Sequence, residues 1–178
     1  MSTSADFNYG VLPQAVVDRL SSLGMANEVL MAADSQSSSQ IGDISRFRGM
    51  ALLTATERET RLALKDSEGG VNTVAQGLLA KTVSRQLLMK LGADGAIVLR
   101  RGAVAESYDI DQIPAFNQSP RDVAGAGDSM LVVASLALAS GASIWEASVL
   151  ASIAAAVQVS RVGNIPLRAE DLLRELAE

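Results

Sequence analysis

Residues 121–140 read Arg-Asp-Val-Ala-Gly-Ala-Gly-Asp-Ser-Met, followed by the apolar run Leu-Val-Val-Ala-Ser-Leu-Ala-Leu-Ala-Ser. Gly125, Ala126 and Gly127 lie where a loop meets this run, which we expect to form a helix. The first amide groups of a helix lack internal partners, and together with the helix dipole they favour a phosphate placed against them. The stretch therefore predicts an anion hole made by Gly125, Ala126 and Gly127.

Asp128 falls in the first turn of the expected helix, beside the predicted anion hole. A carboxylate at this place can accept the proton of a hydroxyl group that attacks a phosphoryl group. The alternative is a turn followed by a helix-capping Asp, which is a common arrangement in α/β proteins. Taken alone, Gly-Ala-Gly-Asp favours the alternative, and only the wider sequence context makes Asp128 a candidate catalytic base.

That context is long and ordered. The segment 122–128 is followed by a helix of small residues, by Gly-Ala-Ser-Ile-Trp-Glu-Ala at 141–147, and by an Ala-rich segment at 151–159 before Gly163. This arrangement closely resembles the second signature of the ribokinase-like (PfkB) carbohydrate kinases, and within that family it looks most like the heptose kinase branch. The resemblance implies phosphotransfer from ATP, with Mg²⁺, to a hydroxyl of a sugar or sugar phosphate.

Composition excludes several other classes of protein. The chain has 178 residues, 48% of them hydrophobic, which suffices for one domain with a real core. A net charge of −5 gives no basic footprint for nucleic acid and argues against a membrane surface. The chain contains no His, which removes Ser-His-Asp triads, and no Cys, which removes thiol chemistry and fits a reducing cytoplasm. We expect neither a transmembrane helix nor a signal peptide.

Strand and helix patterns alternate along the chain. Strands are expected at 2–8, 28–34, 46–54, 86–102 as a tight hairpin, and 103–113; helices are expected at 13–23, 57–64, 71–83, 126–140, 143–161 and 168–178. This order predicts an α/β layered fold. The resemblance makes it a ribokinase-like three-layer α/β/α fold with a mostly parallel central sheet, in which the segment at 6–10 would end a central strand.

Thr54-Ala-Thr-Glu-Arg-Glu59 is the second chemical clue. The resembled family carries Asn-x-x-Glu here, directly after a strand, and its Glu helps to hold the magnesium and phosphate network. By that resemblance Glu59 would position Mg²⁺ through water, and Thr56 would contact the nucleotide in place of Asn. The alternative is that Glu57 and Glu59 only favour the first turn of the helix that follows. The residues leave both interpretations open.

Three further stretches of the chain resemble nucleotide and cation sites of the family. Lys-Leu-Gly-Ala-Asp-Gly at 90–95 lies over a Thr-x-Gly-x-x-Gly segment that lines the ATP site, which suggests roles for Lys90, Gly92, Asp94 and Gly95. Lys90 could touch nucleotide phosphates or point to solvent, and a plain hairpin explains the segment equally well.

Ser152 falls where relatives have an Asn near the adenine. Asp122 resembles a position that often binds a monovalent cation, and its alternative role is to cap a turn.

The resemblance covers nearly the whole chain but only about the C-terminal half of a complete kinase. In complete relatives the N-terminal half supplies the first strands of the sheet, the lid and most sugar contacts. We therefore expect residues 1–178 to be one domain with the nucleotide and base side of the site, and to pair with a second copy or with a missing N-terminal half. The rival hypothesis is a non-catalytic nucleotide-binding or assembly module, either a kinase remnant or one half of a split enzyme.

Overall fold

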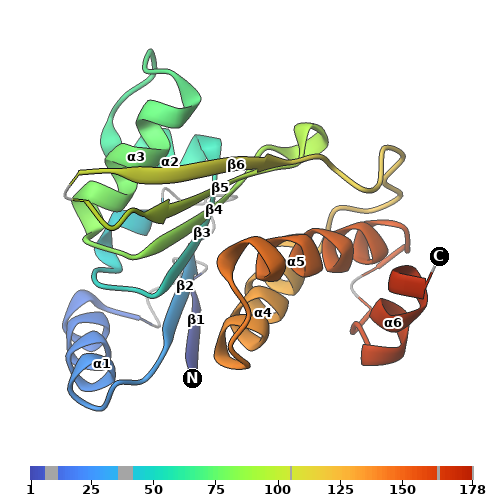
Figure 1. The fold of residues 1–178 in the computed structure, drawn as a ribbon, viewed down its shortest axis with the longest axis horizontal. Coiled ribbons are helices and arrows are strands. Elements are labelled where there is room, and N and C mark those ends of the chain that lie inside the picture. Colours follow the sequence, from blue (N-terminus) through green and yellow to red (C-terminus); the bar gives the residue numbers. More distant parts are fainter. Residues whose placement is uncertain (7–11, 36–41, 105, 164, 178) are drawn as a thin grey trace.

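The computed structural model describes residues 1–6, 12–35, 42–104, 106–163 and 165–177. Within these residues one six-stranded sheet forms the centre of the molecule, with its strands in chain order (Figure 1). The strands are β1 (Ser2–Asp6), β2 (Met31–Ser35), β3 (Leu52–Thr56), β4 (Gln86–Lys90), β5 (Ala96–Arg101) and β6 (Tyr108–Ile113). The pairs from β1 to β4 are parallel, and β5 and β6 are added antiparallel.

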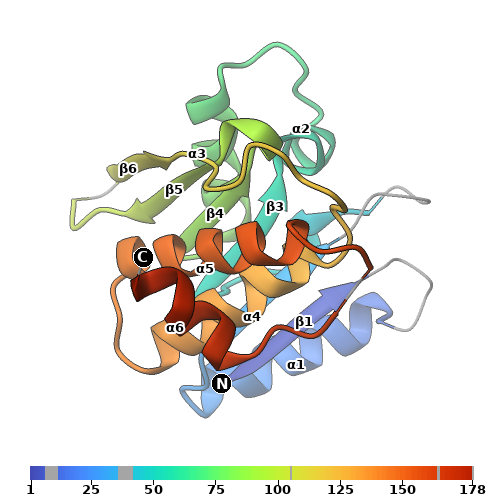
Figure 2. The same cartoon turned by 90° about the vertical axis from the view of Figure 1, so that its right-hand side faces the viewer.

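Helices cover both faces of this sheet (Figures 1 and 2). One face carries α1 (Gln14–Ala26), α2 (Glu57–Leu64) and α3 (Val71–Thr82), and the other carries α4 (Ala126–Ala139) and α5 (Ile144–Val159). The last helix, α6 (Ala169–Ala177), packs beside α5. The expected three-layer α/β/α fold with a mostly parallel sheet is confirmed.

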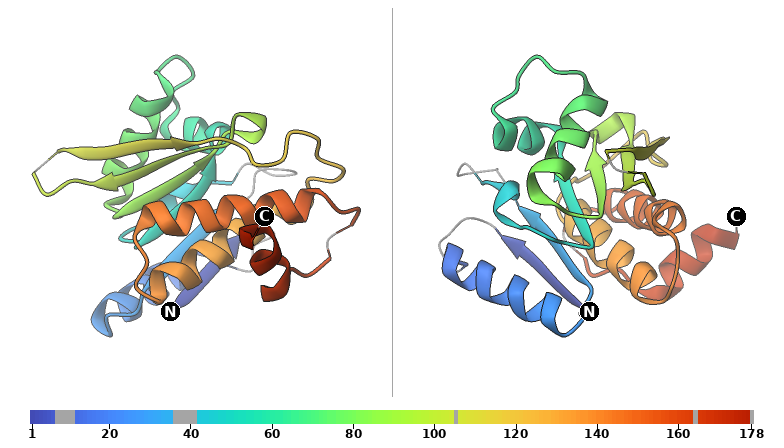
Figure 3. Two further views of the ribbon diagram at one scale, coloured as in Figure 1. Left: turned by 45° about the vertical axis from the view of Figure 1, so that its right-hand side comes forward. Right: turned by 60° about the vertical axis from the view of Figure 1, so that its left-hand side comes forward.

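Alternation along the strands builds two cores, because successive side chains of a strand point to opposite faces of the sheet. Leu53 and Leu87 join the core under α1, α2 and α3, whereas their neighbours Leu52 and Leu88 join the core under α4 and α5. In the second core α4 and α5 pack closely through fully buried small side chains, Ala134, Ala147, Ala151 and Ala154. The two views of Figure 3 show the layers from either side.

Several element boundaries differ from the sequence-based expectation. The strand expected over 46–54 begins only at Leu52, because Ile44–Arg46 forms a 3₁₀ turn capped by Asp43, and Phe47 and Met50 fill the core from the loop. The strands expected from 28 and 103 likewise begin later, at Met31 and Tyr108. Buried loop residues are apolar, as buried strand residues are, so the sequence pattern does not separate the two.

One edge of the sheet lies at β1, whose only neighbour among the described residues is β2, and the other lies at β6. The family resemblance placed the segment 6–10 at the end of a central strand; β1 ends at Asp6, and residues 7–11 lie outside the described part. The Ser/Gln tract at 35–40, whose composition predicts a polar loop after the strand, also falls outside the described part, except that Ser35 belongs to β2.

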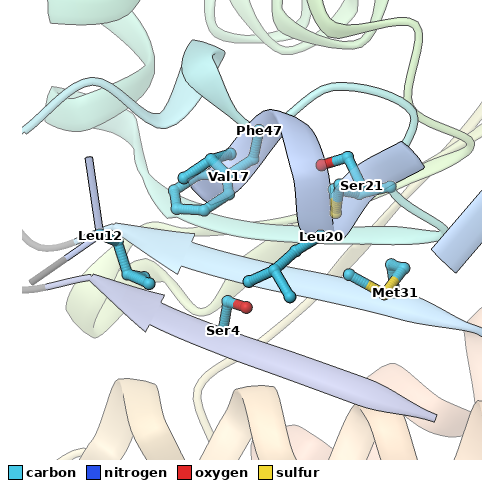
Figure 4. A pocket seen from close by; sticks show the side chains of 8 residues that line it. Ser4, Leu12, Val17, Leu20, Ser21, Met31 and Phe47 are labelled. Atoms are coloured by element: carbon cyan, nitrogen blue, oxygen red, sulfur yellow. The ribbon is translucent and has the colours of Figure 1, made fainter. Parts of the chain in front are cut away.

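A small cavity lies between α1 and the strands β1 and β2 (Figure 4). Its volume is about 10 Å³, which is at the lower limit for one water molecule. Leu20, Ser4 and Met31 approach one another across it in Figure 4. This cavity is a packing gap under the helix and has no room for a ligand.

Among the described helices none is long and apolar enough to cross a membrane.

Candidate nucleotide and phosphate site

The candidate site lies at the carboxyl ends of the parallel strands. Asp34, Thr56 and Lys90 stand at or next to the ends of β2, β3 and β4, which meet at one edge of the sheet. Ligands of open α/β sheets bind at this edge, where strands end and helices begin. A cavity of about 600 Å³ opens here between the start of α2, the β4–β5 turn, the segment after β6, and helices α4 and α5.

Most of the residues that the sequence suggested for nucleotide or phosphate binding line this one cavity. They are Thr56, Glu59, Lys90, Gly92, Gly95, Ala126, Gly127 and Ser152. Two predicted residues are not part of the lining: Asp94, which is exposed, and Gly125, which directly precedes α4. Tertiary folding thus brings these residues from four separate parts of the chain to one cavity.

The predicted anion hole lies at the start of α4. Gly125 is the residue before the first turn and has φ of 78°, a left-handed conformation that glycine adopts without strain. A Cβ atom placed on Gly127 would lie 3.2 Å from Nζ of Lys90 and 3.6 Å from Oδ2 of Asp34. A side chain at Gly127 would therefore fill the space between the helix start and these two charged groups.

Lys90 and Asp34 form an ion pair beside the start of α4. The ammonium nitrogen lies 3.1 Å from both carboxylate oxygens. Asp34 is only 1% exposed. Lys90 therefore does not simply point to solvent, which was one of the two possibilities that the sequence left open. Asp34 was missed by the sequence reading, although an Asp at the end of a buried strand is a signal that could have found it.

Asp128 stands in the first turn of α4, next to the ion pair. Burial raises the pKa of its carboxyl group above the ordinary value, and the nearby Asp34 carboxylate raises it further, while the Lys90 ammonium opposes both. A carboxylate with a raised pKa is a stronger proton acceptor. The electrostatic environment therefore suits Asp128 to take a proton.

Thr56 and Glu59 form a capping box at the start of α2. The Thr56 hydroxyl accepts a hydrogen bond from the Glu59 amide at 3.2 Å, and the Glu59 carboxylate accepts one from the Thr56 amide at 2.7 Å. The helix-start role that the sequence left open for Glu59 is thus present. Both residues also face the cavity, so the capping role and a ligand role are compatible.

Arg58 is a lining residue that the sequence reading did not single out. It is exposed in the first turn of α2, faces the cavity, and forms no hydrogen bond or ion pair with the described residues. Its position between Thr56 and Glu59 could have indicated a role in the site, because all three residues lie at the start of the same helix. Arg58 is thus a cation available to a ligand.

The β4–β5 turn forms one wall of the cavity. Gly95 has φ of 86°, and a Cβ atom there would collide with the carbonyl oxygen of Ile113. Only glycine fits where this turn approaches the end of β6 so closely. The opposite wall is apolar and includes Phe116, Val123 and Val159. Ser152 of α5 reaches the cavity and is 8% exposed.

Asp122 stabilises the loop before the predicted anion hole. Its carboxylate accepts hydrogen bonds from the amides of Ala124 and Gly163, both at 2.9 Å, and these bonds lower the pKa of Asp122. The turn-capping role that the sequence left open is therefore present.

Within the part of the chain that the structure describes, no group of three or more acidic side chains is arranged to hold a metal ion.

With this geometry in view, comparisons with known proteins define the class of protein. The family model described as pfkB family carbohydrate kinase matches residues 1–170. The chain belongs to the PfkB carbohydrate kinase family, as the sequence resemblance implied.

Two curated relatives make the likeness more specific, and both are called bifunctional protein HldE. The protein from Rhodospirillum rubrum is 29% identical over 173 residues, which are 95% of this chain and 33% of the relative. The protein from Geobacter metallireducens is 29% identical over 165 residues, which are 90% of this chain and 31% of the relative. The chain thus spans about one third of the length of these relatives.

Solved structures share the fold. Phosphofructokinase-2 from Escherichia coli, in complex with potassium, has a TM-score of 0.81 at 17% identity, covering 98% of this chain and 55% of that one. Ribokinase from Thermotoga maritima has a TM-score of 0.77 at 20% identity, covering 99% of this chain and 57% of that one. The fold is therefore ribokinase-like, and the chain corresponds to about half of each structure.

Proposed function

We propose that residues 1–178 form one domain, the nucleotide-binding and catalytic-base portion of a kinase that phosphorylates a hydroxyl of a sugar or sugar phosphate. The observation that carries the proposal is the position of Asp128. Its pKa is raised, and it stands in the first turn of α4 near the charges of Lys90 and Asp34, next in the chain to Gly127, which lines the 600 Å³ cavity together with Lys90. A base, an anion hole and a cation thus share one place.

ATP is the ligand whose parts suit the cavity. The apolar wall with Phe116 and Val159 suits a nucleobase, with Ser152 nearby as a hydrogen-bonding group. Polyphosphate would then extend toward the starts of α2 and α4, where helix dipoles and the cations Arg58 and Lys90 favour negative charge. Gly92 and Gly95 allow the backbone to lie against the nucleotide.

Glu59 is the residue that would hold Mg²⁺ near these phosphates, through water. Its buried carboxylate faces the cavity, and oxygen donors are the ligands that Mg²⁺ prefers. When bound, the metal ion would neutralise charge on the phosphates. Asp122, already hydrogen-bonded to two amides, would contribute to a monovalent cation site together with neighbouring carbonyl groups.

In the proposed reaction Asp128 takes the proton from the attacking hydroxyl group. The hydroxyl oxygen forms a bond to the γ-phosphorus of ATP, and the bond to the β-phosphate oxygen breaks to release ADP. Amides of Gly125, Ala126 and Gly127 stabilise the charge that develops on the transferring phosphoryl group. A sugar phosphate of the heptose type is the acceptor that the sequence resemblance to the heptose kinase branch implies. We place the reaction in the cytoplasm.

The edge of β1 that has no partner strand among the described residues favours a second candidate function. The chain corresponds to 55% of phosphofructokinase-2, and β1 has one free edge among the described residues. A non-catalytic nucleotide-binding or assembly module, derived from a kinase or forming half of a split one, would have these properties. Its partner would be an N-terminal half of a PfkB kinase or a second copy of the chain.

Calorimetric titration of the purified chain with Mg-ATP tests the nucleotide assignment that the first candidate function requires. Asp128→Ala and Gly127→Val serve as variants, the second because a side chain at Gly127 meets Lys90. Saturable binding that is lost in Gly127→Val supports a working nucleotide half. Absence of binding by a chain with the circular dichroism of an α/β fold contradicts the nucleotide assignment and leaves the assembly module.

A further inference from the structure

The ion pair between Lys90 and Asp34 joins two strands that are not neighbours. Asp34 lies on β2 and Lys90 on β4, and β3 runs between them. The ammonium nitrogen lies 3.1 Å from each carboxylate oxygen, and the exposed fractions are 16% for the Lys90 side chain and 2% for that of Asp34. An ammonium group this far from solvent needs a counter-ion, because an unpaired buried charge is costly.

The pair occupies the approach to the anion hole. Measured from the Cβ position of Gly127, Nζ of Lys90 lies at 3.2 Å and Oδ2 of Asp34 at 3.6 Å. Lys90 also lines the cavity. A phosphate placed against the first amides of α4 would therefore touch the ammonium group and stand close to the Asp34 carboxylate. Two anions cannot both take full benefit from one ammonium group at this spacing.

We propose that Asp34 is a positioning residue that acts as the internal counter-ion of Lys90. It holds the ammonium group at the start of α4 when no ligand is present, and it gives that group up to the phosphate of an arriving nucleotide. The inference rests on the proposed phosphate-binding role of Gly125–Gly127. Asp34 thus lowers the affinity for free polyphosphate while it keeps Lys90 in place for binding.

This role predicts effects of opposite sign at the two ends of the ion pair. Asp34→Asn removes the competing negative charge with little change in size, so polyphosphate should bind about tenfold more tightly. Lys90→Met removes the cation, so binding should weaken by a similar factor. In the Lys90→Met background the Asp34→Asn change should no longer improve binding by way of Lys90, and the gain should shrink to about twofold or less.

The experiment is calorimetric titration of the full chain with metal-free tripolyphosphate and, separately, with Mg-ATP, at one low salt concentration because salt screens the charges. Asp109→Asn is the matched control, since Asp109 pairs with Arg100 at 2.6 Å at the other end of β5. Circular dichroism verifies the fold of each variant. If Asp34→Asn does not fold, Asp34→Ser removes the same charge with a smaller side chain.

Tighter tripolyphosphate binding by the Asp34 variant, absent in the double variant and in Asp109→Asn, supports the inference. Unchanged or weaker tripolyphosphate binding by a folded Asp34 variant overturns it. If wild type binds Mg-ATP and the Asp34 variant binds each of the two ligands with the same affinity as wild type, the inference fails while the proposed function stands. If no folded variant binds either ligand, the phosphate site itself fails and the inference fails with it.

Discussion

At the scale of single residues, Asp128 is the side chain on which the proposed chemistry depends. In a complete, active assembly, Asp128→Asn should lower kcat by about 10²- to 10⁴-fold, because the hydroxyl group loses its proton acceptor. KM for ATP should change little. Steady-state kinetics with Asp18→Asn, an exposed change on α1, as the control measure this, and near-normal turnover of Asp128→Asn would refute the base assignment.

The pH dependence of turnover follows from the raised pKa of Asp128. The base works only when it is ionised, so activity should fall as the pH drops through a value above that of an ordinary Asp. Because the folded-state pKa is raised, ionised Asp128 destabilises the fold once the pH exceeds its unfolded-state value. Asp128→Asn should therefore raise the melting temperature at neutral pH, and a lowered melting temperature would contradict the raised pKa.

Arg58 gives a second prediction at this scale. Arg58→Gln removes a cation that lines the cavity without a partner among the described residues, so Mg-ATP should bind about five- to tenfold more weakly. The effect should shrink from ATP to AMP, since fewer phosphates remain to be contacted. Calorimetry with Arg19→Gln, an exposed residue of α1, is the control. Equal losses for ATP and adenosine would assign Arg58 to a purely structural role.

At the scale of elements, α2 and α5 start in the same way, but only the start of α2 lines the cavity. Each begins with a capping box, Thr56 with Glu59 and Ser143 with Glu146. Thr56→Ala and Ser143→Ala should each lower the free energy of unfolding by about 1 kcal/mol, because each leaves helix amides without partners.

Only the Thr56 change should also weaken Mg-ATP binding, because Thr56 lines the cavity. Chemical denaturation measures the first effect and calorimetry the second. A loss of binding in Ser143→Ala equal to that in Thr56→Ala would show that destabilisation alone reduces affinity, and it would remove Thr56 from the site.

At the scale of the whole molecule, the side that carries β1 and α1 presents features of an interface. One edge of β1 is free among the described residues, and α1 exposes Val16, Leu20, Leu23 and Met25. Free strand edges and exposed apolar side chains favour pairing with another chain. We expect the isolated chain to associate with itself or with an N-terminal half of a PfkB kinase.

Light scattering over a wide concentration range tests this expectation. The apparent mass should rise with concentration, and Leu20→Lys together with Leu23→Lys should reduce the rise without changing Mg-ATP binding. A clean monomer at every concentration, with no response to an added N-terminal half, would contradict the expectation.

The order of strands and helices could be read from the sequence, because alternating or helical spacing of apolar residues is local information. Helix 57–64 and the start of α3 at Val71 match the structure to the residue. The predicted start of the strand at 46–54 was wrong because the buried loop residues Phe47 and Met50 are apolar like strand residues. Their burial depends on residues far away in the chain, so no local pattern distinguishes them from a strand.

The sequence by itself determined the α/β layers, and it predicted an anion hole at the start of α4 and Asp128 as the candidate base, because each depends on residues close together in the chain. Tertiary structure alone decided that Lys90 pairs with Asp34, that both stand against Gly127, and that Arg58 shares a cavity with Lys90 and Gly127. The physical reason is that strands β2 and β4 end at the same edge of the sheet although 56 positions separate Asp34 from Lys90. Only the folded sheet converts that separation into an ion pair.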